Sequence, residues 1–319
     1  MACSSARKSR YGAVWRWAAS AGVVFVLAQP AFATTLRERI QERRAKAQDA
    51  AEQSPRVLRD VPYGTHPKQR MDIYLPANPS ETSAAPVIFM VHGGGWRVGD
   101  KNAASVVQNK IARWSPRGFV FISINNRLLP DADPLEQARD VARALATAQQ
   151  QASTWGADPG KFILMGHSAG AHLVALLAAS PTLARESGAA PWLGTVALDS
   201  AALDVAPIMQ AKHFNLYDPA FGIDPAYWRA VSPLQVLDGS ARPVLTVCSS
   251  RREDSCAQAR GFVAKATSLG VRAQVLSQDL SHGDINQLLG KPGAYTEAVE
   301  AFMASLSAPV ASRLDSSKP

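Results

Sequence analysis

Six short, nearly continuous apolar segments constrain the fold of this 319-residue chain more than any other feature of its sequence. Strands that are apolar on both sides must be covered on both faces, and strands that alternate with helices run parallel. The sequence therefore predicts an α/β domain with a mostly parallel central sheet flanked by helices. The predicted strands cover residues 86–92, 119–125, 161–166, 194–199, 243–248 and 272–278. The predicted helices between and after them cover Leu135–Gln151, Ser168–Ala179, Ala257–Leu269 and Ala294–Leu306.

Two further strands, over residues 56–64 and 69–76, are predicted to form a hairpin ahead of the parallel strands. The folded domain is expected over residues 56–310, with a flexible tail over 311–319. Residues 34–55 contain no glycine and are rich in helix formers, with Glu42 and Lys46 as a favourable i, i+4 pair. This segment predicts a charged, solvated helix that ends at Ser54–Pro55.

Residues 1–33 have the composition of a secretory signal peptide. The run from Ala18 to Ala28 is apolar but shorter than the roughly 20 residues that span a bilayer. Ala31 and Ala33 occupy the small-x-small positions of a cleavage site. We therefore expect cleavage after Ala33, a periplasmic or secreted protein and no stable membrane anchor; an uncleaved anchor is the alternative. The basic residues of this leader are Arg7, Lys8, Arg10 and Arg16.

The net charge of +8 does not describe a basic binding face. The leader contributes four positive charges and no negative one, and residues 34–59 carry a further surplus of +3. The rest of the chain is therefore nearly neutral, at +1. Nucleic-acid binding needs clustered cations, so this distribution predicts no nucleic-acid partner.

Two cysteines, Cys248 and Cys256, remain after the leader is removed. An even number of cysteines in an oxidising compartment favours a disulfide. The alternative is a pair of unpaired, buried thiols.

Two glycine motifs follow predicted strands, at the edge where open α/β sheets bind ligands. The first is His92-Gly-Gly-Gly-Trp96. Consecutive glycines let backbone N–H groups approach a ligand closely, and such donors can hold a developing oxyanion. A tight turn would not need three glycines and the preceding histidine.

The second motif, Gly166-His-Ser-Ala-Gly170, joins a predicted strand to a predicted helix. Glycines on both sides of Ser168 permit the sharp turn that raises a nucleophilic hydroxyl above the sheet, and they aim the Ala169 N–H at the same oxyanion. Ser168 as a simple helix N-cap is the alternative.

A serine nucleophile needs a base, and His282 is the expected one among six histidines. It lies in a loop after the last predicted strand, which is where the chain order Ser–acid–His places the base. His92 and His167 are expected to orient or pack within their motifs, and His172 to pack inside the helix. His213 lies in an irregular segment where it could line a pocket.

The acid is expected in the loop after the preceding strand, which reads Cys248-Ser-Ser-Arg-Arg-Glu-Asp254. We favour Asp254 and keep Glu253 as the alternative. Asp199 and Asp204 follow an earlier strand and would supply the acid in a variant layout.

These motifs together resemble the HGGG-bearing serine esterases of the α/β-hydrolase superfamily, near the carboxylesterase and arylformamidase-like branch. The resemblance extends from Arg56 to Leu306 and includes "VHGGGWRVGDK", "GKFILMGHSAGAHL" and "SHGDIN". It implies an α/β-hydrolase fold with a small cap between the sixth and seventh strands, and no metal or organic cofactor. The implied site residues are nucleophile Ser168, acid Asp254, base His282 and oxyanion donors Gly94, Gly95 and Ala169. Asn126-Arg127-Leu128 and the acid loop depart from the family pattern.

The expected function is that of an exported serine hydrolase that cleaves a small-molecule carboxylic ester through an acyl-enzyme. Residues 213–228 are rich in aromatic side chains, which predicts an apolar acyl or alcohol pocket in the cap, although some of them would pack the cap's own core. Hydrolysis of N-formyl aryl amides is the alternative activity, and a non-catalytic binding module is a further one. The residues expected to line the pocket are Trp96, His167, His213, Phe214, Tyr217 and Trp228.

Overall fold

The computed structural model of the protein describes residues 38–43, 55–76 and 83–315. The chain divides into two units, Met1–Gln48 and Asp49–Pro319. In the first unit, residues 38–43 form a helix whose side chains are all exposed, within the segment predicted to be helical. The predicted signal peptide and the rest of the segment up to residue 54 lie outside the described residues.

The second unit is built on an eight-stranded sheet with the strand order β1-β2-β4-β3-β5-β6-β7-β8. β1 and β2 form the predicted hairpin, β2 pairs antiparallel with β4, and all other neighbours are parallel. The predicted mostly parallel sheet is thus confirmed. The strands are β1 (Arg56–Pro62), β2 (Arg70–Leu75), β3 (Ala85–Val91), β4 (Val120–Ile124), β5 (Ala157–His167), β6 (Gly194–Leu198), β7 (Val244–Ser249) and β8 (Ala273–Gln278).

The central strands are mostly apolar because their side chains enter two cores in alternation. In β3, Phe89 belongs to one core, whereas its neighbours Ile88 and Met90 belong to the other. Alternation of side chains across a pleated strand explains why a doubly covered strand shows no polar face.

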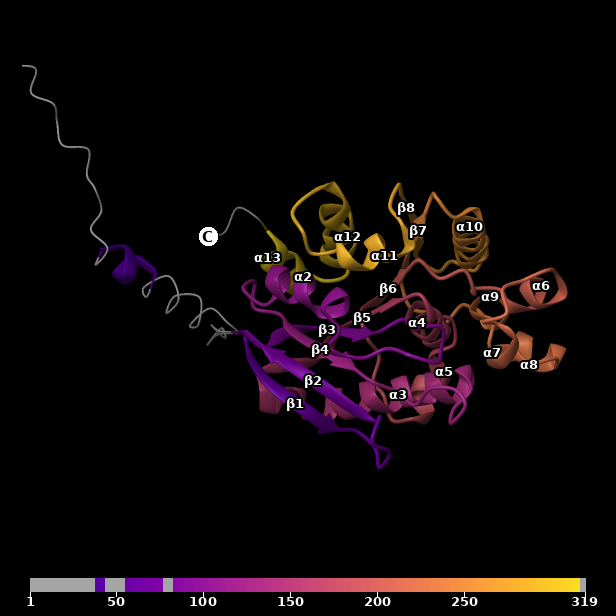
Figure 1. Ribbon diagram of the computed structural model, residues 1–319, viewed down its shortest axis with the longest axis horizontal. Helices are drawn as coiled ribbons and strands as arrows, with labels where there is room; N and C mark the ends of the chain where they lie inside the picture. The colour runs from indigo at the N-terminus through magenta and orange to yellow at the C-terminus, as the bar shows by residue number, and fades with distance from the viewer. Residues whose placement is uncertain (1–37, 44–54, 77–82, 316–319) are drawn as a thin grey trace, which may run out of the picture. The chain divides into compact units, whose positions relative to one another are not determined.

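Two layers of helices cover the sheet, and Figure 1 shows α2, α11, α12 and α13 on the side opposite α3, α4 and α5. α3 begins after Asp133, whose side chain accepts the Glu136 N–H at 3.0 Å, with Pro134 at its first position. None of the described helices is long and apolar enough to cross a membrane. The helices are α2 (Ala104–Trp114), α3 (Pro134–Gln151), α4 (Ala169–Ala179), α5 (Pro181–Glu186), α10 (Glu253–Ser268), α11 (His282–Gln287), α12 (Ala294–Ala304) and α13 (Ala308–Leu314), with a short 3-10 helix η1 (Ala152–Trp155).

The predicted cap insertion is present between β6 and β7. It consists of four helices of four to six residues, which Figure 1 shows together beyond the end of the sheet. They are α6 (Val205–Gln210), α7 (Asp218–Phe221), α8 (Pro225–Ala230) and α9 (Pro233–Val236).

The C-terminal boundary differs from the prediction. α13 continues to Leu314, and the side chains of Val310 and Leu314 are buried in the core next to α12. The folded domain therefore extends past residue 310, because burial of these two side chains anchors the segment that was expected to be a flexible tail.

Candidate active site

Ser168 lies at a sharp turn between the end of β5 and the start of α4. Its backbone has φ +55° and ψ −118°, a conformation that costs energy for a residue with a Cβ. A Cβ on Gly166 would lie 2.3 Å from the carbonyl oxygen of Gly170, and a Cβ on Gly170 would lie 2.4 Å from that of His92. Both flanking glycines are therefore required by close backbone contact, as the motif predicts for a nucleophile turn.

His282 is the histidine next to Ser168. It begins α11, after Ser281, whose Oγ accepts the Asp284 N–H at 3.1 Å. The His282 Nε2 atom lies 3.0 Å from the Ser168 Oγ. This is hydrogen-bonding distance, so the predicted base stands where it can accept the serine proton.

The carboxylate bonded to His282 is Asp199, and not the expected Asp254. Asp199 follows β6 directly, and its Oδ2 lies 2.5 Å from the His282 Nδ1. Asp254 lies in the first turn of α10 and bonds instead to the Ser255 N–H at 2.8 Å and to Arg252 Nη2 at 3.3 Å. The expectation for Asp254 is corrected because α10 begins at Glu253, which leaves the Asp254 side chain 48% exposed.

Four donors surround the completely buried Asp199 carboxylate. Besides His282, it accepts the Ser249 N–H at 2.7 Å, the Ser255 hydroxyl at 2.5 Å and Arg252 Nη1 at 2.9 Å. Burial alone would raise the pKa of Asp199, but these hydrogen bonds and the Arg252 charge hold that pKa well below its ordinary value. The carboxylate is therefore ionised at neutral pH.

The geometry also selects the tautomer of His282. Its Nδ1 can hydrogen-bond to the Asp199 carboxylate only by donating, so Nδ1 carries the proton and Nε2 is left to accept from Ser168. Arg252 Nη1 lies 2.8 Å from the same Nδ1, but a protonated Nδ1 cannot accept, so the Arg252 hydrogen is directed to Asp199. Asp199 thus binds both side chains through Oδ2.

The glycine loop after β3 lies directly against the nucleophile. A Cβ on Gly93 would lie 3.0 Å from the Ser168 Cβ, so only glycine allows this approach. Gly95, at φ +58°, and Ala169 line the same pocket as Ser168, whereas Gly94 is not among the lining residues. The carbonyl of Gly94 accepts two backbone N–H groups of the same loop at 3.1 Å. The oxyanion roles of these three residues stay predictions.

A cavity of about 300 Å³ opens above Ser168. The sheet edge supplies the reacting side chains on one side, and the cap supplies three apolar ones, Phe214, Leu216 and Tyr217, on the other. Small residues fill much of the remaining wall. The full lining is Gly95, Trp96, Ser168, Ala169, Asp199, Ser200, Ala201, Ala202, Phe214, Leu216, Tyr217, Arg252 and His282.

Trp96 joins the glycine loop to α4 and to the cap. Its Nε1 donates to His172 Nδ1 at 3.2 Å, and His172 Nε2 donates to the Val231 carbonyl at 2.7 Å. Its ring packs edge-on against Phe221 at 5.0 Å between centroids and contacts Tyr217 at 6.0 Å. Burial lowers the pKa of His172 to about 4, so this chain of hydrogen bonds runs through a neutral imidazole.

Three of the residues expected to line the substrate pocket do not line the cavity above Ser168 and make other contacts instead. His167 is buried, and its Nε2 donates to the His282 carbonyl at 2.9 Å, so it holds the base in place. Trp228 packs inside the cap and donates from Nε1 to the Phe221 carbonyl at 3.0 Å. His213 lines a different cavity and bonds to Asp218 at 2.9 Å. Trp96, Phe214 and Tyr217 line the pocket above Ser168.

The structure brings Cys248 and Cys256 to bonding distance, with their Sγ atoms 2.02 Å apart and their Cα atoms 5.1 Å apart. The pair encloses the loop that supplies Ser249, Arg252 and Ser255 to Asp199. The expected disulfide would therefore restrain the donors of the acid and not the acid itself. Its presence in the isolated protein stays a prediction.

Within residues 38–43, 55–76 and 83–315, no three His, Cys, Asp or Glu side chains come together as a metal site would require. The described site consists of a serine, a histidine and a carboxylate in sequential contact, beside backbone N–H groups in a glycine loop. Such an arrangement can activate the serine hydroxyl as a nucleophile.

Comparisons with known proteins match parts of this chain. The family model described as BD-FAE matches residues 71–205, which include Ser168 and Asp199. A probable isoprenylcysteine alpha-carbonyl methylesterase, ICME, of Oryza sativa subsp. japonica is 34% identical over 122 residues, which are 38% of this chain and 28% of that protein. LipM of Mycobacterium tuberculosis, a probable carboxylic ester hydrolase, is 27% identical over 266 residues, 77% of this chain and 61% of that protein.

The chain thus spans less than two thirds of the length of each of these two relatives. Among solved structures, a truncated form of a carbohydrate esterase from gut microbiota superposes with a TM-score of 0.67 at 19% identity. The superposition covers 80% of this chain and 98% of the other. At this identity the likeness shows that the two chains share a fold.

Proposed function

We propose that this chain, which has an α/β-hydrolase fold, is a serine hydrolase of the HGGG-bearing type that cleaves carboxylic esters. The observation that carries the proposal is the continuous contact from Ser168 Oγ to His282 Nε2, at 3.0 Å, and from His282 Nδ1 to Asp199 Oδ2, at 2.5 Å. The esterase names of the relatives support the same reaction class.

In the proposed reaction, Ser168 Oγ attacks the ester carbonyl carbon while His282 Nε2 takes its proton. The carbonyl oxygen becomes an oxyanion, which the N–H groups of the glycine loop and of Ala169 stabilise. His282 then donates the proton to the departing alcohol oxygen, and an acyl-enzyme remains. Water, deprotonated by His282, releases the acid and restores Ser168.

Asp199 stays ionised throughout this cycle. It holds the Nδ1 proton of His282 and stabilises the imidazolium that forms when Nε2 is protonated. Because the pKa of Asp199 lies well below its ordinary value, proton transfer from His282 to the carboxylate is unfavourable. The acid thus orients and stabilises the base and takes no proton itself.

We further propose that the protein is exported and that the Cys248–Cys256 disulfide forms there. The support for export is the basic, apolar and small-residue pattern of residues 1–33. An oxidising compartment favours the disulfide, and the two cysteines already lie in bonding geometry.

The test replaces Ser168 by alanine, with Ser153→Ala as a matched control at an exposed serine in η1, outside the site. Ser168→Ala should lower kcat for p-nitrophenyl acetate by up to about a million-fold and should abolish labelling by a fluorophosphonate. The control should keep both. A folded Ser168→Ala protein that turns over substrate near the wild-type rate would disprove the assignment.

The same assay separates the two substrate classes. Wild-type protein should hydrolyse simple carboxylic esters faster than N-formylkynurenine. Hydrolysis of N-formylkynurenine without ester hydrolysis would assign the protein to the formamidase class instead. Absence of all hydrolysis and of labelling would leave a non-catalytic binding module.

A further inference from the structure

A second, larger cavity of about 760 Å³ lies beside the pocket above Ser168. The two cavities have Ala201, Phe214 and Tyr217 in common as lining residues, so they adjoin at these side chains. The second cavity, which we call the α10 groove, runs between α6 and the following loop on one side and α10 on the other. Its volume falls within the range of small-molecule sites, roughly 300–1,000 Å³.

Two of the four α10 residues that line the groove are small, and the other two are Asp254 and Gln258. Ala257 and Gly261 lie one helical turn apart and both face the groove. A Cβ on Gly261 would meet Leu234 Cδ1 at 3.6 Å, which is ordinary contact, and Gly261 has no positive φ. Neither backbone strain nor close packing requires glycine here, so larger side chains at these positions would occupy the groove itself.

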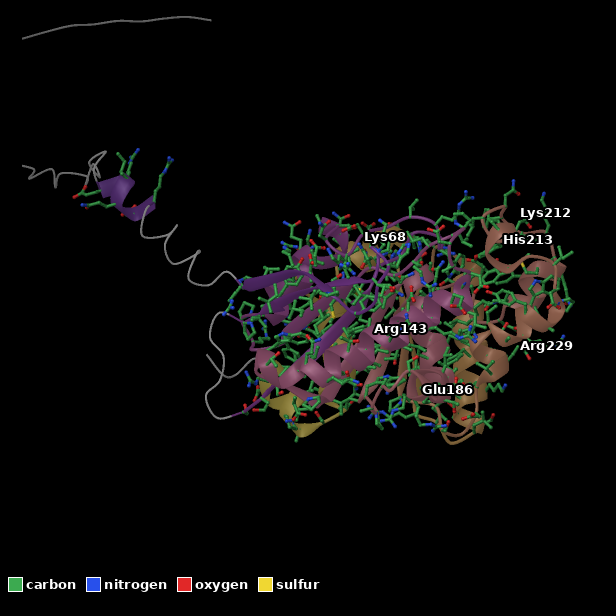
Figure 2. The ribbon with its side chains drawn as sticks, turned by 90° about the horizontal axis from the view of Figure 1, so that it is seen from below. Lys68, Arg143, Glu186, Lys212, His213 and Arg229 are labelled. Carbon is green, nitrogen blue, oxygen red and sulfur yellow. A yellow bond between two sulfur atoms is a disulfide. The ribbon has the colours of Figure 1, made fainter. Side chains whose placement is uncertain are left out.

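The groove is lined mainly by apolar side chains, and its polar lining residues are Asp204, Lys212, His213, Asp254 and Gln258. Pro207, Ile208, Leu234 and Phe214 line it, and Phe214, 68% exposed, stands between the groove and the reacting serine. Lys212 lies at the solvent-facing end of the cap in Figure 2, beside His213. An apolar chain that extends from Ser168 into the groove would be removed from water along its length and would end near Lys212 and His213.

The position of the groove relative to His282 decides which part of an ester it meets. Gly95, Trp96, Ala169, Arg252 and His282 line only the smaller pocket, so the groove itself contacts neither the oxyanion side of Ser168 nor the histidine. Its wall, α10, begins next to Arg252, whose Nη1 lies 2.8 Å from the His282 Nδ1. The alcohol oxygen must receive its proton from His282, so the alcohol portion departs on the histidine side.

We propose that the α10 groove binds the apolar alcohol portion of an ester whose acyl portion is small and occupies the pocket of about 300 Å³. This proposal rests on the proposed esterase function. It names the substrate class as esters of short acids with long or bulky apolar alcohols.

The first experiment compares two substrate series at fixed conditions with the full-length protein. Alkyl acetates from ethyl to octyl lengthen the alcohol, and methyl esters from acetate to octanoate lengthen the acid. Each methylene that enters the groove should raise kcat/KM for the acetates by about fourfold, which corresponds to about 0.8 kcal/mol of transfer free energy. The methyl esters should show no such rise beyond a short acyl chain.

The second experiment fills the groove by substitution. Gly261→Phe and Ala257→Phe should each abolish the rise along the acetates while keeping ethyl acetate hydrolysis within about twofold of wild type. Ala264→Phe, on the same helix but exposed and outside the groove, is the matched control and should keep the rise. Circular dichroism and thermal unfolding identify any variant that does not fold. One folded variant, Gly261→Phe or Ala257→Phe, is enough for the comparison with wild type.

A binding measurement makes the outcome independent of catalysis. Calorimetry should detect binding of 1-octanol to wild type and to Ala264→Phe, and at least tenfold weaker binding to Gly261→Phe. Equal binding to all three, a rise in the methyl ester series instead of the acetates, or filled variants that retain the rise would each overturn the proposal. Binding of 1-octanol without hydrolysis of any ester would retain the groove as an alcohol site and reject the esterase function.

Discussion

Replacement of Asp199 by asparagine should lower kcat by about ten-thousand-fold, the scale found when a triad acid becomes an amide. The Asp199 carboxylate accepts from His282, Arg252, Ser249 and Ser255. An amide has one acceptor oxygen, and its NH2 group can only donate. If that NH2 faces His282, Nδ1 must accept, Nε2 carries the proton, and Ser168 loses its base.

The same substitution should also lower stability. An amide oxygen has lone pairs for two of the four donors, so about two charge-assisted hydrogen bonds are lost at a completely buried group. At roughly 1.5–3 kcal/mol each, the expected loss in the free energy of unfolding is about 3–6 kcal/mol. Kinetics must therefore be measured at a temperature where circular dichroism shows the variant to be folded.

The matched control is Asp254→Asn. This side chain is about half exposed and its Oδ1 accepts the Ser255 N–H, which an asparagine oxygen can also accept. We expect a change in kcat of about twofold, the scale of a surface substitution. Initial rates with p-nitrophenyl acetate and the rate of fluorophosphonate labelling measure both variants. A folded Asp199→Asn protein within tenfold of wild type, together with a severe loss in Asp254→Asn, would refute the assignment of the acid.

Two further predictions concern pH and the cysteines. The pKa of His172 in the folded protein, about 4, lies below its ordinary 6.5, so its contribution to stability is full above pH 6.5 and is lost as the pH falls towards 4, where only the unfolded state gains the proton. In urea unfolding at pH 7 and pH 4, His172→Gln should reduce this loss of unfolding free energy by about 3 kcal/mol. An unchanged pH dependence in the variant would contradict the assigned pKa. Exported protein that is denatured without reduction should show no free thiol at Cys248 or Cys256, and two free thiols would refute the disulfide. Cys248→Ser should lower the free energy of unfolding by about 2–3 kcal/mol in the chain-entropy model.

The sheet was predictable because most residues of its central strands are buried and apolar. The helix α2 was not predicted, and one reason is a lysine on its buried side. Lys110 is almost completely buried and donates from Nζ to the carbonyl of Asn286 at 2.6 Å, while burial lowers its pKa to about 7. The cap helices have four to six residues, too few to show a helical period.

The sequence predicted Ser168 and His282 because each follows a strand at the same sheet edge, in a motif that leaves few alternatives. It did not distinguish the acid, since Asp199 and Asp254 both follow strands at that edge. The distinction depends on backbone direction: Asp199 has φ +56°, which turns its side chain inward, whereas Asp254 lies in a helix that directs it outward. The sequence "CSSRRED" did depart from the family pattern, and that departure lies in the loop that binds Asp199.

The placement of the acid after β6 explains the composition of the loop after β7. A buried carboxylate is stable only if its lone pairs are satisfied and its charge is compensated. Apart from His282, every donor to Asp199 comes from the segment between Cys248 and Cys256, which includes the end of β7 and the start of α10: the Ser249 N–H, the Arg252 guanidinium and the Ser255 hydroxyl. Arg252 also neutralises the charge of the acid while the imidazole is neutral. The segment between the two cysteines therefore keeps Asp199 ionised and fixed, so that damage to this segment should impair proton transfer at Ser168.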